Sequence, residues 1–136
     1  NMCHVIHRNK GNIKVLIILK IIKKFIYNIR YQLFMPNFVK VASTSDLKPG
    51  ENKVVAVNGT DVALFNVDGE FFAINNTCLH RGGPLGEGFL EDDVVTCPWH
   101  GWRYNVKTGA NAMIPTAKVA TYQVKVENDD VLVSLE

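Results

Sequence analysis

The sequence predicts an all-β fold, an antiparallel sandwich or partial barrel that carries one long insertion. Short apolar runs recur from Phe38 onward between turn signals, which is typical of strands. Two of the intervening turns are Asn-Gly and Asp-Gly, the dipeptides that tight antiparallel hairpins favour. No long amphipathic helix pattern follows Met35, so helices are not expected to form the core.

Four strands are expected first, at residues 38–43, 53–57, 61–67 and 70–75. The turns Asn58-Gly59 and Asp68-Gly69 join the last three into a meander. The stretch STSDLKPGE, residues 43–51, can begin a helix, but Pro49-Gly50 ends it within about a turn.

A second hairpin is expected at the end of the chain, with strands at 121–127 and 131–136 joined around Asn128–Asp130. Its first strand alternates polar residues with Tyr122, Val124 and Val126. This period of two predicts one buried face. Between the two groups of strands lies the insertion, residues 76–120.

Residues 1–34 have a different composition. They hold seven Lys or Arg and no acid, and their longest purely apolar run is Val15–Leu19, so no transmembrane anchor is expected. Twenty-one of the 34 residues are Ile, Lys, Asn, Tyr or Phe, whose codons are rich in A and T. The segment is interpreted as translated leader sequence before a start at Met35, or as a basic amphipathic helix for a membrane surface. Three potential ligands in it are interpreted as incidental: Cys3, His4 and His7.

Residues 35–136 hold eight Lys or Arg against thirteen Asp or Glu, a net charge of −5. The basic residues are scattered and outnumbered, so binding to nucleic acid is not expected. The negative charge predicts instead a salt-sensitive encounter with basic patches on protein partners. Three basic residues near the insertion's loops are either docking groups or solvated charges: Arg81, Arg103 and Lys107.

The insertion contains two loops with paired metal-binding side chains, CLHRGG at 78–83 and CPWHGW at 97–102. The candidate ligands are Cys78 and His80, then, after sixteen residues, Cys97 and His100. Three cysteines are too few for a disulfide scaffold. A chance meeting, a structural zinc site in a binding module and a 2Fe–2S cluster all remain open. Zinc fingers usually place a Cys pair before a His pair, whereas each loop here offers one of each.

The two-part motif, continued as CPWHGWRYNVKTG, resembles the Rieske iron–sulfur proteins from about Met35 to the end of the chain. The resemblance implies one 2Fe–2S cluster, with Cys78 and Cys97 on the inner iron and His80 and His100 on the outer one. It also implies a Rieske-like antiparallel β-sandwich with a small cluster-binding subdomain. The expected domains are a basic, Ile- and Lys-rich N-terminal extension, 1–34, for which a non-native or a disordered segment is one interpretation, and a Rieske 2Fe–2S domain, 35–136.

The resemblance also bears on the reduction potential. High-potential Rieske proteins carry a disulfide at the positions of Gly83 and Trp99, and a serine hydroxyl at the position of Trp102. Only Tyr104 retains its counterpart, so a potential near the low end of the range, about −150 mV, is expected. Pro115 lies where the family has a proline loop over the cluster, or is an ordinary turn proline.

No nucleophile–base pair or nucleotide loop is visible, and little chain remains to build a substrate pocket. The chain is therefore not expected to be an enzyme. The resemblance implies a cytoplasmic one-electron carrier between a flavin-containing reductase and a terminal oxygenase. The alternative within the family is a small subunit that works with the large subunit of an assimilatory nitrite reductase. The alternative of another class is the zinc-stabilised binding module.

Overall fold

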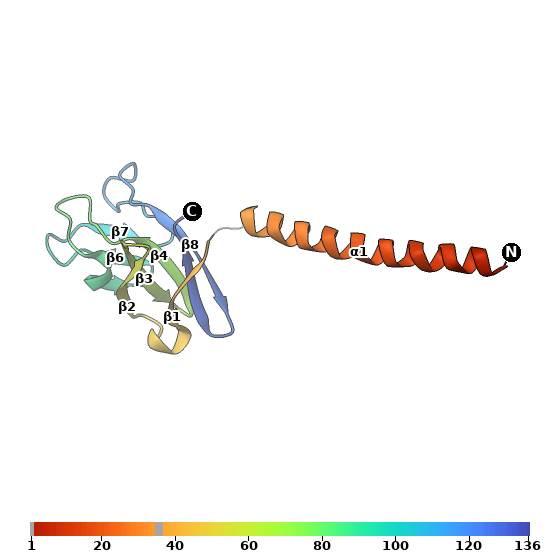
Figure 1. Ribbon diagram of the computed structural model, residues 1–136. Helices are drawn as coiled ribbons and strands as arrows, with labels where there is room; N and C mark the ends of the chain where they lie inside the picture. The colour runs from red at the N-terminus through yellow and green to blue at the C-terminus, as the bar shows by residue number, and fades with distance from the viewer. Residues whose placement is uncertain (1, 35–36) are drawn as a thin grey trace. The chain divides into compact units, whose positions relative to one another are not determined.

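The computed structural model describes residues 2–34 and 37–136, and the chain divides into two compact units, Asn1–Met35 and Pro36–Glu136 (Figure 1). Met35, the suggested start, lies outside the described residues, as do the side chains of Cys3, His4 and His7.

The first unit is one helix, α1 (Met2–Phe34), and all its described side chains, at 13–30, are exposed. At about 100° per residue, the apolar residues Val15, Ile18, Leu19, Ile22, Phe25, Ile26 and Ile29 share one side of the described stretch 13–30. The four lysines and Arg30 of this stretch lie on the rest of its circumference. A basic amphipathic helix for a membrane surface stays a prediction. No helix among the described residues is long and apolar enough to cross a membrane.

The second unit is built on a six-stranded antiparallel sheet, which confirms the predicted fold class. Its strand order is β1-β9-β8-β4-β3-β2. The strands are β1 (Val39–Ser43), β2 (Asn52–Val57), β3 (Thr60–Val67), β4 (Glu70–Asn75), β8 (Thr121–Glu127) and β9 (Asp130–Ser134).

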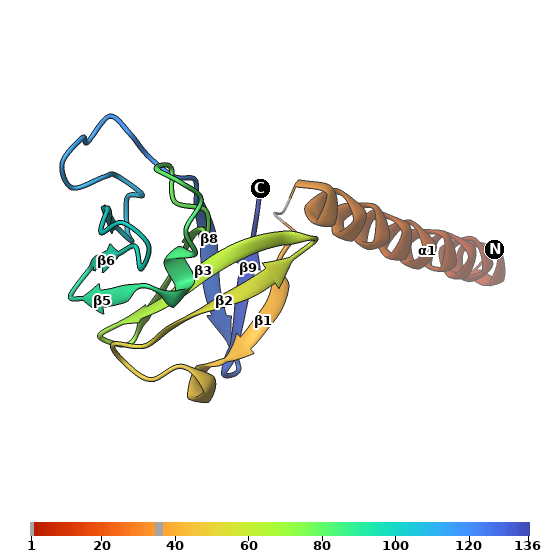
Figure 2. The same cartoon turned by 90° about the vertical axis from the view of Figure 1, so that its left-hand side faces the viewer.

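The insertion forms a second sheet of three short strands, which the sequence pattern did not reveal. They are β5 (Phe89–Glu91), β6 (Val94–Thr96) and β7 (Arg103–Asn105), paired in that order. Figure 2 shows β5 and β6 to one side of the large sheet. A 3-10 turn, η2 (Leu85–Glu87), precedes β5.

The predicted hairpin turns are confirmed. Asn58 and Gly59 have φ angles of 49° and 82°, and Asp68 and Gly69 have 52° and 94°. Positive φ at both central residues defines the turn whose twist matches that of paired strands. β2, β3 and β4 consequently pair without a break in register.

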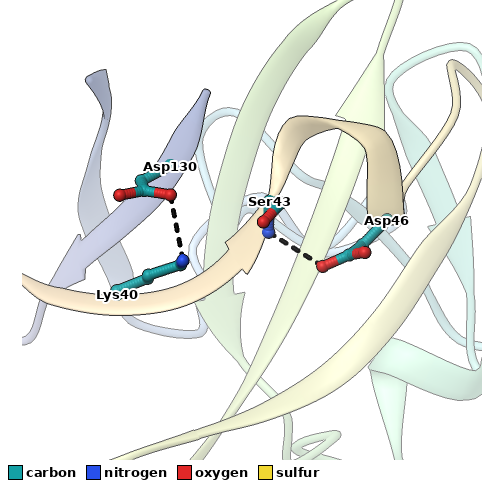
Figure 3. Close-up of polar contacts among 4 residues, drawn as sticks. All are labelled: Lys40, Ser43, Asp46 and Asp130. Carbon is teal, nitrogen blue, oxygen red and sulfur yellow. Dashed lines mark hydrogen bonds and ion pairs between the residues drawn. The ribbon is translucent and has the colours of Figure 1, made fainter. Parts of the chain in front are cut away.

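The predicted short helix is the 3-10 turn η1 (Thr44–Asp46). Figure 3 shows its closure: the backbone N–H of Ser43 donates to Asp46 Oδ2 at 2.9 Å. Beside it, Lys40 Nζ lies 3.0 Å from Asp130 Oδ1 and ties β1 to β9. Both of these side chains are exposed, so the ion pair contributes about 0–1 kcal/mol.

Two apolar cores flank the large sheet. One packs β1, β2 and β9 over one face. The other lies between the sheet and the insertion and includes Phe65, Leu85, Tyr104 and both cysteines of the insertion. This second core positions the candidate site.

The alternation predicted for β8 holds only in its first half. Tyr122 and Val124 pack against the core, but Val126 is 49% exposed. β8 pairs with β4 only at Thr121 and Tyr122, so the second half of β8 diverges from β4.

Candidate metal centre

The first candidate loop follows β4 and is closed by two backbone hydrogen bonds. The N–H of Gly82 donates to the carbonyl of Cys78, and the N–H of Cys78 donates to the carbonyl of Gly83, both at 2.9 Å. Gly82 has a φ of 78°, a conformation that glycine adopts without a steric cost. The turn fixes the Cys78 backbone and leaves the His80 side chain at its outer end.

The second loop, between β6 and β7, repeats this construction. The N–H of Gly101 donates to the carbonyl of Cys97 at 3.1 Å, and the N–H of Cys97 donates to the carbonyl of Trp102 at 2.7 Å. Gly101 also has a φ of 78°. The twin motifs of the sequence are thus twin turns in space, each with its cysteine at the base and its histidine outside.

The two cysteines are buried next to each other. Cys78 is 2% and Cys97 3% exposed, and both are free thiols. Burial is the main cause that raises the pKa of Cys97; the adjacent Cys78 raises it further, while hydrogen bonds from the backbone of Trp99 and His100 lower it. Those amides are arranged to stabilise a sulfur anion once a metal has displaced the proton.

The two histidines meet at the exposed ends of the loops. The ring centroids of His80 and His100 are 4.9 Å apart, at an interplanar angle of 82°. Trp102 stacks on His80 with centroids 4.7 Å apart and an angle of 13°. The structure therefore brings the two candidate thiols together in the interior and the two candidate imidazoles together at the surface. The stacking partner of His80 was not predicted.

Tyr104 connects the base of the site to the core. Its side chain is fully buried, and its hydroxyl lies 3.4 Å from Cys78 Sγ while accepting the N–H of Leu79 at 3.1 Å. Burial, followed by the hydrogen bond with Cys78, raises the pKa of Tyr104 to about 12. The hydroxyl therefore keeps its proton at neutral pH and can donate it toward sulfur.

Gly83 lets the two loops approach each other. A Cβ built on Gly83 would lie 2.6 Å from Cys97 Sγ and 3.1 Å from Trp99 Cγ. Side chains do not tolerate contacts this short, so a residue with a Cβ would displace the sulfur or the indole. Because Gly83 has no side chain, Cys97 Sγ and the Trp99 indole can lie directly against its backbone.

A third segment borders the site and contains Pro115. Asn111 holds its start, because its Oδ1 accepts the N–H groups of Met113 and Ile114 at 2.8 and 3.0 Å. Both of those residues line a hollow of about 490 Å³ together with His100. The segment thus lies beside the second loop, and Pro115 is exposed within it. Asn111 was not predicted, although Asn beside turn residues is a recognisable signal.

The donor set fits a 2Fe–2S cluster better than a single metal ion. A structural zinc site needs four donors around one point. Among the residues whose side chains are described, no group of three or more His, Cys, Asp or Glu could hold one ion. Two adjacent buried thiols with backbone amides directed at sulfur, and two outer imidazoles, instead offer one pair of like donors to each of two irons.

Comparison with known proteins agrees with this chemistry. Residues 37–123 match the family described as the Rieske [2Fe-2S] domain. The chain is 45% identical over 98 residues to the ferredoxin component of biphenyl 2,3-dioxygenase of Rhodococcus jostii (strain RHA1), covering 71% of this chain and 92% of that protein. It is 38% identical over 101 residues to the ferredoxin component of the naphthalene 1,2-dioxygenase/salicylate 5-hydroxylase systems of Ralstonia sp, covering 74% and 97%.

A solved structure of a dioxygenase ferredoxin is also similar to this chain. The ferredoxin of carbazole 1,9a-dioxygenase from Nocardioides aromaticivorans IC177 superimposes with a TM-score of 0.69 at 31% identity, covering 74% of this chain and 99% of that one. The chain therefore belongs to the Rieske family and carries one 2Fe–2S cluster.

Proposed function

We propose that this chain is the ferredoxin component of an aromatic-ring dioxygenase system, accepting one electron from a flavin-containing reductase and delivering it to a terminal oxygenase. The observation that carries the proposal is the pair of matching turns, which buries two thiols and exposes two imidazoles at one end of a β domain. The similar proteins are electron-transfer components rather than catalytic ones. A solved complex of reduced oxygenase and oxidised ferredoxin contains a similar chain, at a TM-score of 0.68 and 36% identity.

The proposed cluster ligands are Cys78 and Cys97 on the inner iron and His80 and His100 on the outer iron. When bound, the cluster accepts and releases one electron. The protein's own residues determine how readily it does so. Backbone amides of the second loop and the Tyr104 hydroxyl donate toward the sulfurs, and the core around Leu85 excludes water from them.

Exposure of the histidines supports electron transfer at this end of the domain. His80 and His100 are both exposed, so a partner that covers the loop ends comes within contact distance of the outer ligands. The cysteines are shielded below them.

The domain organisation proposed is a Rieske domain at 35–136 preceded by an extension at 1–34. The division into compact units and the family match from residue 37 support this boundary. A cytoplasmic location is also proposed, since the similar dioxygenase ferredoxins work with protein partners. The relatives favour the dioxygenase carrier over a nitrite reductase subunit, and family membership argues against the zinc-stabilised module.

The direct test is chemical analysis of the full-length protein purified without oxygen. The expected result is iron and acid-labile sulfide in equal amounts, a red-brown colour, and an electron paramagnetic resonance signal that appears on reduction with dithionite. Reduction by NADH with a catalytic amount of a flavin reductase should lower the visible absorbance as much as reduction with dithionite does. A colourless protein that contains zinc and no sulfide would refute the proposal.

A further inference from the structure

An apolar surface surrounds the exposed histidines. We name it the apical surface and define it as Leu79, Trp99, Met113 and Ile114. All four side chains are at least half exposed, and Met113 is 85% exposed. Leu79 and Trp99 precede the two histidines directly, and Met113 and Ile114 share the hollow beside His100. Exposed apolar side chains gathered around one site indicate contact with a partner.

Two charged residues lie next to the apical surface, and both are basic. Arg81 follows His80 in the first loop, and Arg103 lines the hollow with His100. Both arginines are exposed, and neither is in an ion pair with any side chain that the structure describes. Their charges are therefore available to a partner.

The acidic residues belong to other segments of the sequence. The segments that carry the site, 77–83, 97–103 and 111–118, contain three basic residues and no acid, a charge of +3. The rest of 37–136 holds five basic and thirteen acidic residues, a charge of −8. Within the small sheet, Glu91, Asp92 and Asp93 form the turn at the far end of the strands from the second loop.

We propose that the apical surface docks on a face of the electron-accepting partner that has an apolar centre and a rim of carboxylates. This rests on the proposed function and specifies its partner. It differs from the expectation drawn from the net charge of −5, which pointed to basic patches on partners. The arginines beside the histidines would also steer this edge of the domain toward an acidic face during approach.

The test replaces the partner with two one-electron oxidants of opposite charge, hexacyanoferrate(III) and tris(phenanthroline)cobalt(III). Each takes one electron from the reduced full-length protein and becomes hexacyanoferrate(II) or the cobalt(II) complex, while the protein loses one electron. Stopped-flow absorbance gives both rates at low and high ionic strength. The rate with the anion should fall as salt rises, because salt screens its attraction to the arginines.

Matched variants separate local charge from total charge. R81Q/R103Q should slow oxidation by the anion about tenfold at low salt, since each arginine attracts a trivalent anion at close range. K48Q/K53Q removes the same charge from residues outside the three site segments and should change the rate less than twofold. Equal effects of the two pairs, or an anion rate that rises with salt, would overturn the proposal.

Voltammetry tests the apolar half of the surface. On gold coated with mixed carboxylate and methyl groups, the wild-type protein should give a stronger faradaic signal than on an amine and methyl coating. M113Q/I114Q should weaken that signal several-fold, whereas an unchanged signal contradicts an apolar centre. A colourless protein without a signal on either surface would refute the proposed function itself, while a coloured protein that prefers the amine coating would refute only the docking chemistry.

Discussion

Replacement of Tyr104 by Phe isolates one hydrogen bond to the metal centre. The aromatic ring keeps its place in the core, and only the hydroxyl 3.4 Å from Cys78 Sγ is lost. A donor to a ligand sulfur stabilises the more negative, reduced state more than the oxidised state. The variant should therefore have a lower midpoint potential than the wild type.

The size of the shift follows from the energy of such a bond. For a one-electron couple, a tenfold change in the equilibrium constant of reduction is about 1.36 kcal/mol and shifts the potential by about 59 mV. If the hydrogen bond is stronger by about 1 kcal/mol in the reduced state, its loss therefore lowers the midpoint potential by about 40 mV. The N–H of Leu79 also loses its acceptor. Leu79 is half exposed, so water can replace that bond and the loss of stability should stay below about 1 kcal/mol.

The assay is a spectroelectrochemical titration of both proteins with mediators at neutral pH. Tyr122→Phe is the matched control, since the Tyr122 hydroxyl accepts a hydrogen bond from Asn75 Nδ2 at 3.0 Å, in the large sheet. The control should keep the wild-type potential. A Tyr104→Phe potential equal to that of wild type, or a shift of the same size in the control, would refute the argument that this hydroxyl tunes the site.

Three further substitutions address the site. His100→Ala should leave the outer iron short of one ligand and bleach the protein, as visible absorbance and iron analysis would show; a full cluster would refute the ligand assignment. Gly83→Ala places a Cβ 2.6 Å from Cys97 Sγ and should reduce iron content at unchanged yield of folded protein, measured by circular dichroism. Trp102→Ala removes the ring stacked on His80 and should speed loss of colour in air several-fold, with Trp102→Phe restoring most of the lifetime.

Gly59→Ala is the control for the glycine substitution. A Cβ there would meet nothing within 4 Å, although φ is 82°. The expected cost is about 1 kcal/mol of folding stability from backbone strain, with iron content unchanged. Iron loss in both glycine variants would mean that general destabilisation, not crowding of the sulfur, empties the site.

The strands of the large sheet could be predicted from the sequence because each is long enough to show its pattern. β3 has eight residues and lies between turns whose dipeptides favour the positive φ angles that the structure shows. The strands of the small sheet have three residues each. Three residues span barely one period of alternation, so no pattern could distinguish them from loop.

The candidate ligands could be named because their order and spacing resemble a known motif, but their surroundings could not. The stacking of Trp102 on His80 joins residues from different loops, and no local pattern encodes such a pair. The contact between Gly83 and Cys97 is of the same kind. The sign of the charge around the histidines also depends on how three separate segments meet, which the net charge conceals.

The two matching turns grow from different sheets, the first from β4 and the second from the hairpin of β6 and β7. A cofactor bound by both would link two layers that also meet through their shared core and through hydrogen bonds from Asn52 Nδ2 to the carbonyls of Gly86 and Gly88. Iron affinity should then report how well the layers pack, even when a substitution lies far from any ligand. Conversely, in the apoprotein the small sheet is expected to unfold locally before the large sheet does. The large sheet would then stay folded while the cofactor is inserted.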